Sequence, residues 1–327
     1  MPVSHPFKRL GLRAPVFQAP IGAIASVELA AAVSEAGGLG HLACTWRSPD
    51  QLREMFGATG SRTKRPFGAN FVVDFPIDER LGIALEHGVR AISFFWGDGS
   101  SHLDRVKAAD AVAIQVVGSV DEAKCAADSG FDVIVAQGRE AGGHVRGDLG
   151  TMTLVPQVVD AVAPLPVVAG GGIADGRGAS AALSLGAAGV WVGTRFLAAR
   201  EANIHAEYQQ RVLAASAADT LYSQLFDIGW PDASLRSLKN STTEKWERAG
   251  RPSSPHRPGE GDIIAWRPDG TKIPRYFFGS PTRDLNGEVE AMALYAGEGV
   301  GLVRAIQPAA AIVEEFANAI GGFDARA

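Results

Sequence analysis

Residues 164–194 read PLPVVAGGGIADGRGASAALSLGAAGVWVGT and contain one complete strand–helix–strand unit. Apolar runs at 164–172 and 188–194 predict two strands, and the alanine-rich stretch 176–185 between them predicts a helix. The apolar runs are continuous rather than alternating, as expected of parallel strands that are buried on both faces. This stretch therefore predicts an α/β fold with a parallel sheet.

The same alternation of strands and helices fills the chain before this unit. Six further apolar runs predict strands at 15–20, 38–43, 66–73, 89–96, 111–117 and 131–137. Helices are predicted at 26–38, 48–55, 77–86, 119–128 and 155–162. Eight strands with intervening helices favour a closed (β/α)8 TIM barrel. The alternative is an open doubly wound sheet, which usually has fewer strands.

The pattern changes after residue 202. Prolines and aromatic residues are mixed between residues 230 and 292, without a regular strand–helix alternation. We therefore predict a small subdomain over the barrel mouth at 203–292, and a barrel formed by 1–202 and 293–327. Residues 298–318 are helix-like with a break at Pro308, and we expect them to pack back on the barrel.

Composition excludes several classes of function. The 327 residues carry a net charge of −5 and no long basic run, so nucleic-acid binding has little support. No stretch reaches the roughly 18 apolar residues of a membrane span, and the N-terminus has no apolar signal core. We expect a cytoplasmic protein, with a homodimer as one assembly that the sequence permits. Cys44 and Cys125 are interpreted as free thiols, and no metal site is predicted.

Glycines at the ends of the last two predicted strands indicate a phosphate site. Gly171 and Gly172 follow one strand, and Gly193 with Thr194 ends the next. Glycine lets backbone N–H groups approach an anion closely, and the start of a following helix adds about half a positive charge. The alternative interpretation is a pair of tight turns without a ligand.

Four neutral amides stand in or at the ends of other predicted strands. An amide both donates and accepts hydrogen bonds, and four around one mouth suit a flavin ring with its ribityl hydroxyls. Any one of them alone is more often a hydrogen-bonded group of the barrel interior, and the four together favour a ligand. The four are Gln18, Asn70, Gln115 and Gln137.

The stretch QGREAGGHVRGDLG, residues 137–150, places a histidine after two glycines. Gly142 and Gly143 would let the backbone pass close to a planar cofactor, and His144 would then project over the mouth. Imidazole can exchange a proton near neutral pH, so His144 is the candidate catalytic residue. The alternative is a loop histidine that hydrogen-bonds to the backbone.

Several motifs together resemble the nitronate monooxygenase family, also called the 2-nitropropane dioxygenases. They are QAP (18–20), ELAAAVSEAGGLG (28–40), FGANF (67–71), QGREAGGHVRG (137–147), VVAGGGI (167–173), GAAGVWVGTRF (186–196) and YAGEGVGLV (295–303). The superfamily also contains FMN-dependent enoyl-acyl-carrier-protein reductases and NADH:quinone reductases. Compared with the family, this chain carries Arg146 in the glycine motif and neutral amides at Gln115 and Gln137.

The resemblance implies a TIM barrel that binds FMN without a covalent bond. The phosphate would lie on Gly171, Gly172, Gly193 and Thr194. The ring and ribityl chain would meet Ala19, Pro20, Asn70, Gln115, Gln137 and Gly142. The family's catalytic histidine corresponds to His144 in this sequence.

The resemblance implies an FMN-dependent oxidoreductase that oxidises alkyl nitronates with O₂. The first alternative is NAD(P)H-dependent reduction of FMN, which then reduces a quinone or an enoyl thioester. The second is a barrel that binds a sugar phosphate and no flavin. Trp230, Tyr276, Phe277 and Tyr295 are candidates to wall the substrate pocket, although aromatic residues more often form plain core.

Overall fold

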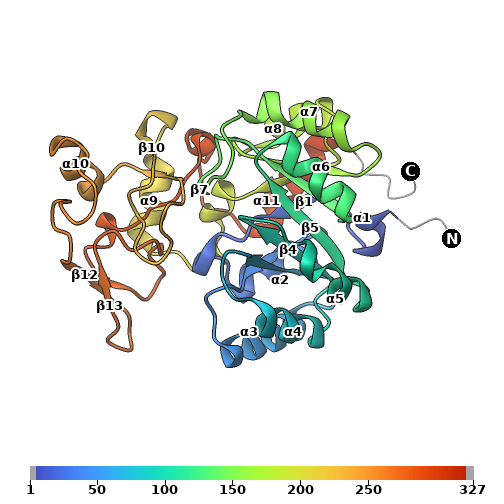
Figure 1. Cartoon of the computed structure of the whole chain (residues 1–327), viewed down its shortest axis with the longest axis horizontal. Helices are drawn as coiled ribbons and strands as arrows, with labels where there is room; N and C mark the ends of the chain where they lie inside the picture. Colours follow the sequence, from blue (N-terminus) through green and yellow to red (C-terminus); the bar gives the residue numbers. More distant parts are fainter. Residues whose placement is uncertain (1–4, 322–327) are drawn as a thin grey trace.

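The computed structural model describes residues 5–321 and shows a barrel with a smaller lobe beside it (Figure 1). Eight parallel strands form one sheet in the order β1-β9-β8-β6-β5-β4-β3-β2. Leu39, just before β2, closes the ring: it bridges to Phe17, and its carbonyl accepts from the N–H of Gln18 at 2.9 Å. The predicted TIM barrel is thereby confirmed. The strands are β1 (Val16–Gln18), β2 (His41–Ala43), β3 (Gly68–Val72), β4 (Ala91–Phe95), β5 (Val112–Val117), β6 (Val133–Gln137), β8 (Val167–Gly170) and β9 (Gly189–Val192).

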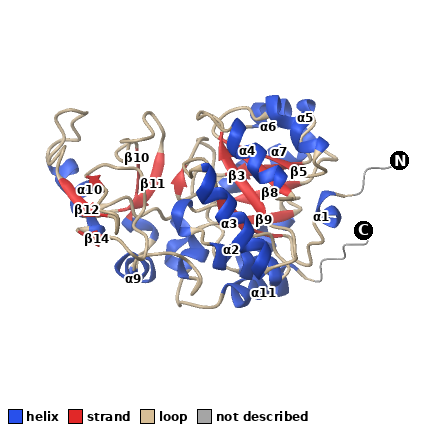
Figure 2. Ribbon diagram, turned by 90° about the horizontal axis from the view of Figure 1, so that it is seen from below, coloured by secondary structure: helices blue, strands red, loops and turns tan. Residues whose placement is uncertain are grey.

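Helices surround the strands, as Figure 2 shows. Each predicted helix is present, and two short helices, Pro6–Arg9 and Leu103–Ala108, were not predicted from the sequence. The helix after β6 begins at Thr151, four residues earlier than predicted, because the Glu140 carboxylate accepts the Thr151 N–H at 2.8 Å. The helices are α1 (Pro6–Arg9), α2 (Val27–Glu35), α3 (Pro49–Arg62), α4 (Asp78–Glu86), α5 (Leu103–Ala108), α6 (Val120–Ser129), α7 (Thr151–Val162), α8 (Gly176–Ser184) and α11 (Ala309–Ile320).

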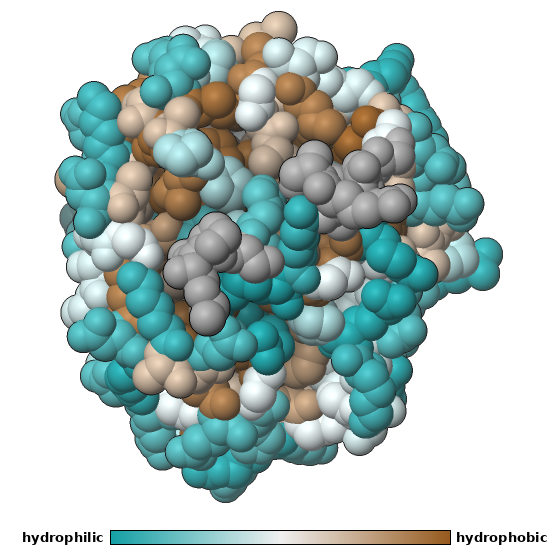
Figure 3. All heavy atoms as spheres, turned by 90° about the vertical axis from the view of Figure 1, so that its right-hand side faces the viewer, coloured by the Kyte–Doolittle hydropathy of each residue, from teal (hydrophilic) through white to brown (hydrophobic). Residues whose placement is uncertain are grey.

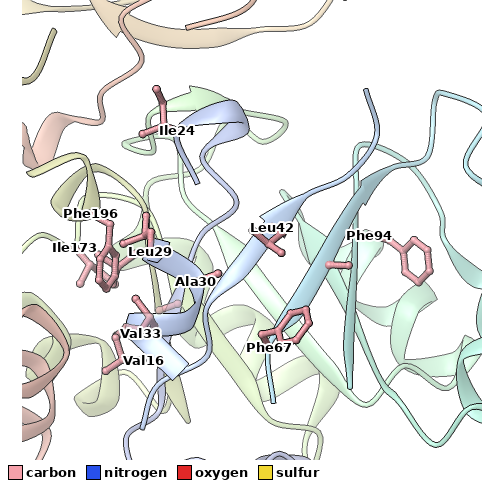
Figure 4. Close-up of a cluster of buried hydrophobic side chains, with 14 of the residues drawn as sticks. Val16, Ile24, Leu29, Ala30, Val33, Leu42, Phe67, Phe94, Ile173 and Phe196 are labelled. Carbon is pink, nitrogen blue, oxygen red and sulfur yellow. The ribbon is translucent and has the colours of Figure 1, made fainter. Parts of the chain in front are cut away.

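Two apolar cores hold the barrel together. Alternate strand residues fill the interior, and Phe7 and Leu10 from the N-terminal segment pack with them. The second core lies between the strands and the helices, where Val16, Leu29 and Val33 meet (Figure 4). Burial of apolar surface on both faces of the sheet explains the continuous apolar runs of the sequence.

The end of the barrel that faces away from the lobe is drawn in Figure 3. Hydrophilic side chains surround this face, with smaller hydrophobic areas between them. The N-terminal helix α1 lies at this end in Figure 1. The loops that follow the strands therefore lie at the opposite end, beneath the lobe, where TIM barrels place their active sites.

A histidine is buried inside the barrel. The ring of His41 lies against Trp191, with centroids 4.7 Å apart and an interplanar angle of 55°, and neither ring nitrogen has a hydrogen-bond partner among residues 5–321. Its neighbour across the ladder is Gly68, where an added Cβ would lie 2.3 Å from the imidazole. Gly68 therefore leaves the space that the His41 ring occupies.

The lobe is built mainly from the proline- and aromatic-rich segment. It has small apolar cores of its own, one around Ile264 and Ile273 and another around Phe226 and Tyr276. We keep 203–292 as the proposed extent of this subdomain. Its elements are α9 (Ala206–Ala214), β10 (Thr220–Ser223), β11 (Leu235–Leu238), α10 (Ser241–Arg248), β12 (Ile263–Trp266), β13 (Lys272–Pro274) and β14 (Asn286–Gly287).

One short strand links the two parts. β7 (Gly143–His144) leaves the loop between β6 and α7 and pairs antiparallel with β11, with His144 opposite Leu235. The N–H of Val145 extends this pairing to the carbonyl of Ser234 at 2.8 Å. Within residues 5–321, no helix has the length and apolar character needed to cross a lipid bilayer.

Candidate active site

A cavity of about 840 Å³ lies between the barrel mouth and the subdomain. The loops after β1, β2, β3, β6, β8 and β9 line one side, and the subdomain lines the other. Of the predicted site residues, those in its lining are Ala19, Pro20, Asn70, Gln137, Gly142, Gly143, His144, Gly171, Gly172, Gly193 and Thr194. The structure thus brings together residues that are far apart in the sequence.

His144 presents its ring to a wall of aromatic side chains. Its imidazole stacks on the indole of Trp230, with ring centroids 3.9 Å apart and an interplanar angle of 24°. Tyr295 lies 5.4 Å away and Trp96 lies 6.1 Å away, measured between ring centroids. Pairing of β7 with β11 sets the backbone direction that places the ring there.

Burial controls the protonation of His144. The side chain is 9% exposed, and burial lowers its pKa to about 3. The imidazole is therefore uncharged at neutral pH, and Nε2 has no hydrogen-bond partner within the described part of the chain. His144 lines the cavity, and an uncharged imidazole can accept a proton from a bound molecule.

Four backbone N–H groups form a donor cluster at the ends of β8 and β9. They belong to Gly171, Gly172, Gly193 and Thr194, and none donates a hydrogen bond to another group of residues 5–321. The Thr194 hydroxyl accepts from the N–H of Gly297 at 2.9 Å, so its own proton stays available. Gly172 is exposed and the other three residues are half-buried, and unpaired N–H groups at strand ends can donate to an anionic ligand.

The helices beside the donor cluster do not direct free N-terminal N–H groups at the proposed anion, as the sequence had led us to expect. Asp175 caps α8 by accepting from the N–H groups of Arg177 and Gly178, at 3.0 and 3.2 Å. Glu140 does the same for α7 at Thr151. Both helix N-termini already face a carboxylate, so the anion-binding capacity of this region comes from the strand-end N–H groups.

Close packing and backbone conformation require glycine at two positions of the site. Gly171 has a φ of +105°, and an added Cβ would lie 2.8 Å from the carbonyl oxygen of Gly138. At Gly142 an added Cβ would lie 2.4 Å from the nitrogen of Gly297. The YAGEGVG segment near the C-terminus therefore packs directly on the loop that carries His144.

The four predicted amides divide into two pairs. Asn70 lines the cavity and donates to the Ser93 hydroxyl at 2.9 Å, and Gln137 lines it with its carbonyl oxygen unpaired among residues 5–321. Gln18 and Gln115 are outside the lining. Gln18 accepts from the N–H of His41 at 3.0 Å, and Gln115 donates to the carbonyl of Gly97 at 2.9 Å.

Several lining residues were not predicted from the sequence. Trp230, Phe277 and Tyr295 line the cavity as expected, whereas Tyr276 is fully buried beneath Arg257 and outside the lining. Further lining side chains come from loops and from helix α9, in segments that carry no motif. They include Trp46, Arg47, Phe75, Tyr208, Arg267 and Phe278.

Trp46 is 41% exposed, and its ring lies 5.2 Å from Trp230 and 4.9 Å from Phe278, between centroids. It therefore extends the aromatic wall away from His144. Arg146, which the family motif lacks, lies on the outside and pairs with Glu122 at 2.5 Å.

Comparison with known proteins places this geometry in context. The sequence model of the nitronate monooxygenase family matches residues 6–79 and 73–318. The nitronate monooxygenase npaC of Metarhizium robertsii is 36% identical over 338 residues, which cover 92% of this chain and 89% of that protein.

A second relative is named for a different activity. The (3aS,4S,5R,7aS)-5-hydroxy-7a-methyl-1-oxo-octahydro-1H-indene-4-carboxyl-CoA dehydrogenase of Rhodococcus jostii is 38% identical over 234 residues, or 71% of this chain. The match spans only 65% of that protein's length.

Two solved structures are similar over nearly the whole chain. FabK from Thermotoga maritima has a TM-score of 0.79 and 27% identity, covering 96% of this chain and 94% of that one. The nitroalkane oxidase of Streptomyces ansochromogenes has a TM-score of 0.77 and 27% identity, covering 95% and 96%.

Proposed function

This chain belongs to the nitronate monooxygenase family, and from that premise we propose that it oxidises alkyl nitronates with O₂ and FMN. One observation supports this most directly: His144 and the donor cluster line the same cavity. The imidazole of His144 is uncharged, and its Nε2 has no hydrogen-bond partner within the described residues. The donor cluster suits a phosphate, and the imidazole suits a substrate that gives up a proton or carries carbanion character.

The residues present fit FMN. Its phosphate would be held by the N–H groups of Gly171, Gly172, Gly193 and Thr194, together with the Thr194 hydroxyl. Asn70 and the unpaired Gln137 carbonyl oxygen offer polar partners for the rest of the cofactor. In this proposal Gln18 and Gln115 act indirectly, by holding neighbouring backbone in place. Bound FMN would supply the redox chemistry between the substrate carbon and O₂.

His144 has a defined part in this chemistry. With a neutral nitroalkane, the imidazole of His144 accepts the proton from the α-carbon, and the product is the nitronate. With a preformed nitronate, no proton has to be removed, and the ring contributes position and hydrogen bonding. Trp230 and the surrounding aromatic side chains exclude water, which keeps the ring unprotonated before the substrate arrives.

Anaerobic mixing tests the proposal. The FMN-loaded protein is mixed with an alkyl nitronate and, in a separate arm, with NADH, while the flavin absorbance near its visible maximum is followed. Bleaching by nitronate and reoxidation on admission of O₂ are the expected results. Purified protein without a yellow chromophore, or with no response to nitronate, contradicts it.

A second candidate is an oxidoreductase that acts on a thioester. The Rhodococcus relative bears the name of a carboxyl-CoA dehydrogenase, and it is 38% identical over 71% of this chain. The cavity of about 840 Å³ also leaves room for a substrate larger than a small nitroalkane. Rapid bleaching by NADH, with none by nitronate, would favour this second function.

A further inference from the structure

Arg146 follows His144 by two positions in the chain, but its side chain lies outside the cavity lining. Its Nε donates to the Glu122 carboxylate at 2.5 Å. Its guanidinium group lies over the indole of Trp96, 5.8 Å from the ring centroid. The same cation therefore contacts a carboxylate and the face of an aromatic ring, and both contacts stabilise a positive charge.

Trp96 connects Arg146 with the candidate base. Its ring meets the imidazole of His144 in a T-shaped contact, with centroids 6.1 Å apart and an interplanar angle of 84°. It meets the indole of Trp230 in a similar way, at 5.3 Å and 74°. Trp96 is half-buried and outside the cavity lining, so it supports these two rings without contacting a molecule in the cavity.

The backbone of Trp96 is held in an unusual conformation. Its φ is +63°, in the left-handed region, which is rare for a bulky aromatic residue. Such a conformation persists only where surrounding contacts maintain it. Gln115 maintains the turn that follows: its Nε2 donates to the Gly97 carbonyl at 2.9 Å, and its Oε1 accepts from the Gly99 N–H at 3.2 Å. Gln115 thus fixes the backbone beside Trp96, while Arg146 lies over the ring.

Arg146 is itself fixed by the packing of two barrel loops. The Glu122 carboxylate that pairs with it also accepts the N–H of Gly118 at 2.8 Å, in the loop after β5. The backbones of Gly118 and Gly147 lie so close that an added Cβ at Gly147 would be 2.1 Å from the Gly118 carbonyl oxygen. Arg146 therefore joins the loop after β5 to the loop that carries His144.

We propose that Arg146 is a positioning residue for the candidate base: it holds Trp96 against His144 and thereby fixes the direction of the imidazole. This inference rests on the proposed function, because it takes His144 as the base that removes a proton from a neutral nitroalkane. Arg146 contacts neither substrate nor cofactor in this arrangement. A base must lie within reach of the proton that it accepts, so a less constrained imidazole slows proton removal in particular.

A comparison of two substrates tests this role in the FMN-loaded protein. Arg146→Gln removes the cation, and kcat/KM for a neutral nitroalkane should fall about 3- to 10-fold, as for loss of a cation–π contact. A preformed nitronate needs no proton removal, so its kcat/KM should stay within about twofold of the wild-type value. Arg146→Lys keeps the charge and should recover most of the loss. An equal fall for both substrates would indicate general damage and overturn the inference.

A double-mutant cycle tests whether Arg146 acts through Trp96. In a Trp96→Leu background, Arg146→Gln should have little further effect on nitroalkane turnover, and an undiminished effect would overturn the inference. The matched control is Arg251→Gln. Arg251 pairs with Glu247 at 2.5 Å and lies 5.5 Å from the ring centroid of Trp246, outside the cavity lining, so its loss should leave turnover unchanged.

Hydrogen–deuterium exchange at the imidazole Cε1, followed by mass spectrometry, gives a measurement that does not depend on turnover. In the wild type, His144 should exchange more slowly than His256, which is exposed. Arg146→Gln should accelerate exchange at His144 and leave His256 unchanged. No acceleration at His144 would overturn the inference. If exchange behaves as expected and the wild type does not oxidise nitroalkanes, the proposed function fails while the contact of Arg146 with Trp96 still holds His144.

Discussion

The imidazole of His144 and the indole of Trp230 lie nearly parallel, with ring centroids 3.9 Å apart, although they are far apart in the chain. His144 comes from a loop of the barrel, and Trp230 comes from the subdomain. The stacking covers one face of the ring and contributes to the burial that lowers the pKa of His144 to about 3. The protonation state of the candidate base therefore depends on the subdomain.

Replacement of His144 should separate cofactor binding from turnover. His144→Asn keeps a polar side chain but removes the proton acceptor, so kcat/KM for a neutral nitroalkane should fall by about 10²–10⁴-fold. FMN should stay bound because the donor cluster is untouched. O₂ consumption and the flavin-to-protein absorbance ratio measure the two effects, and unchanged turnover would remove His144 from the chemistry.

The pH dependence of the same reaction tests the role of Trp230 as a positioning residue. In the wild type, the pKa of about 3 keeps His144 uncharged, so kcat/KM should show no loss near pH 6.5 as the pH falls. Trp230→Leu exposes the imidazole of His144 to water and should raise its pKa toward 6.5. Because a protonated imidazole cannot accept a proton, kcat/KM of this variant should then fall as the pH decreases below that value. The control is Trp266→Leu, since Trp266 is 43% exposed and outside the cavity lining. An identical pH profile for wild type and Trp230→Leu would contradict the proposed role.

The Thr194 hydroxyl provides a test of the phosphate site. Thr194→Val removes the hydroxyl, which is the acceptor for Gly297 N–H and a proposed donor to phosphate. A hydrogen bond to a charged group contributes about 1.5–3 kcal/mol, so FMN affinity should fall by at least ~10-fold. Thr194→Ser keeps the hydroxyl and should restore affinity to near the wild-type value. Fluorescence titration of apoprotein with FMN gives both values, and equal affinities for the valine and serine variants would exclude the hydroxyl as a donor.

Acid stability should reveal the two buried histidines. Burial lowers the pKa of His41 and of His144 to about 3, below the unfolded value near 6.5. The unfolded chain therefore binds protons between these pH values that the folded chain does not. Their contribution to stability is present above pH 6.5 and is lost as the pH falls toward 3, at roughly 1.4 kcal/mol per pH unit for each histidine.

Urea unfolding at several pH values measures this slope. His41→Leu should reduce the slope of the unfolding free energy against pH by ~1.4 kcal/mol per pH unit, which is the contribution of one histidine. His256→Leu, at an exposed position, serves as the control for loss of a histidine. A slope that His41→Leu leaves unchanged would show that the imidazole is protonated in the folded state.

Eight strands could be predicted from the sequence because each is a continuous apolar run bounded by glycine or polar residues. Helix α2 was predicted as well, within residues 26–38, and Ser26 caps its start by accepting from the N–H of Leu29 at 3.0 Å. Helix α5 was missed because it is six residues long and polar, without a clear apolar period. The local pattern of apolar residues therefore predicts the elements of the barrel, except where an element is very short.

The site could be predicted only in part. Glycines at strand ends and the His144 motif are local signals, and the cavity contains them. The stacking of His144 on Trp230 depends on the pairing of β7 with β11, which has no local signal because β7 has only two residues. Tertiary contacts also determine where an amide side chain points. The sequence therefore could not distinguish Gln137, which lines the cavity, from Gln115, which donates to a backbone carbonyl.

The two-residue strand β7 has a consequence for how such proteins diversify. It ties the candidate base to β11 of the subdomain by backbone hydrogen bonds, while Trp230 of the same subdomain sets the base's surroundings. Recombination that exchanged this lobe for another would alter the selection of reactants and the basicity of the imidazole in a single event. Descendants of such an exchange would inherit both traits together.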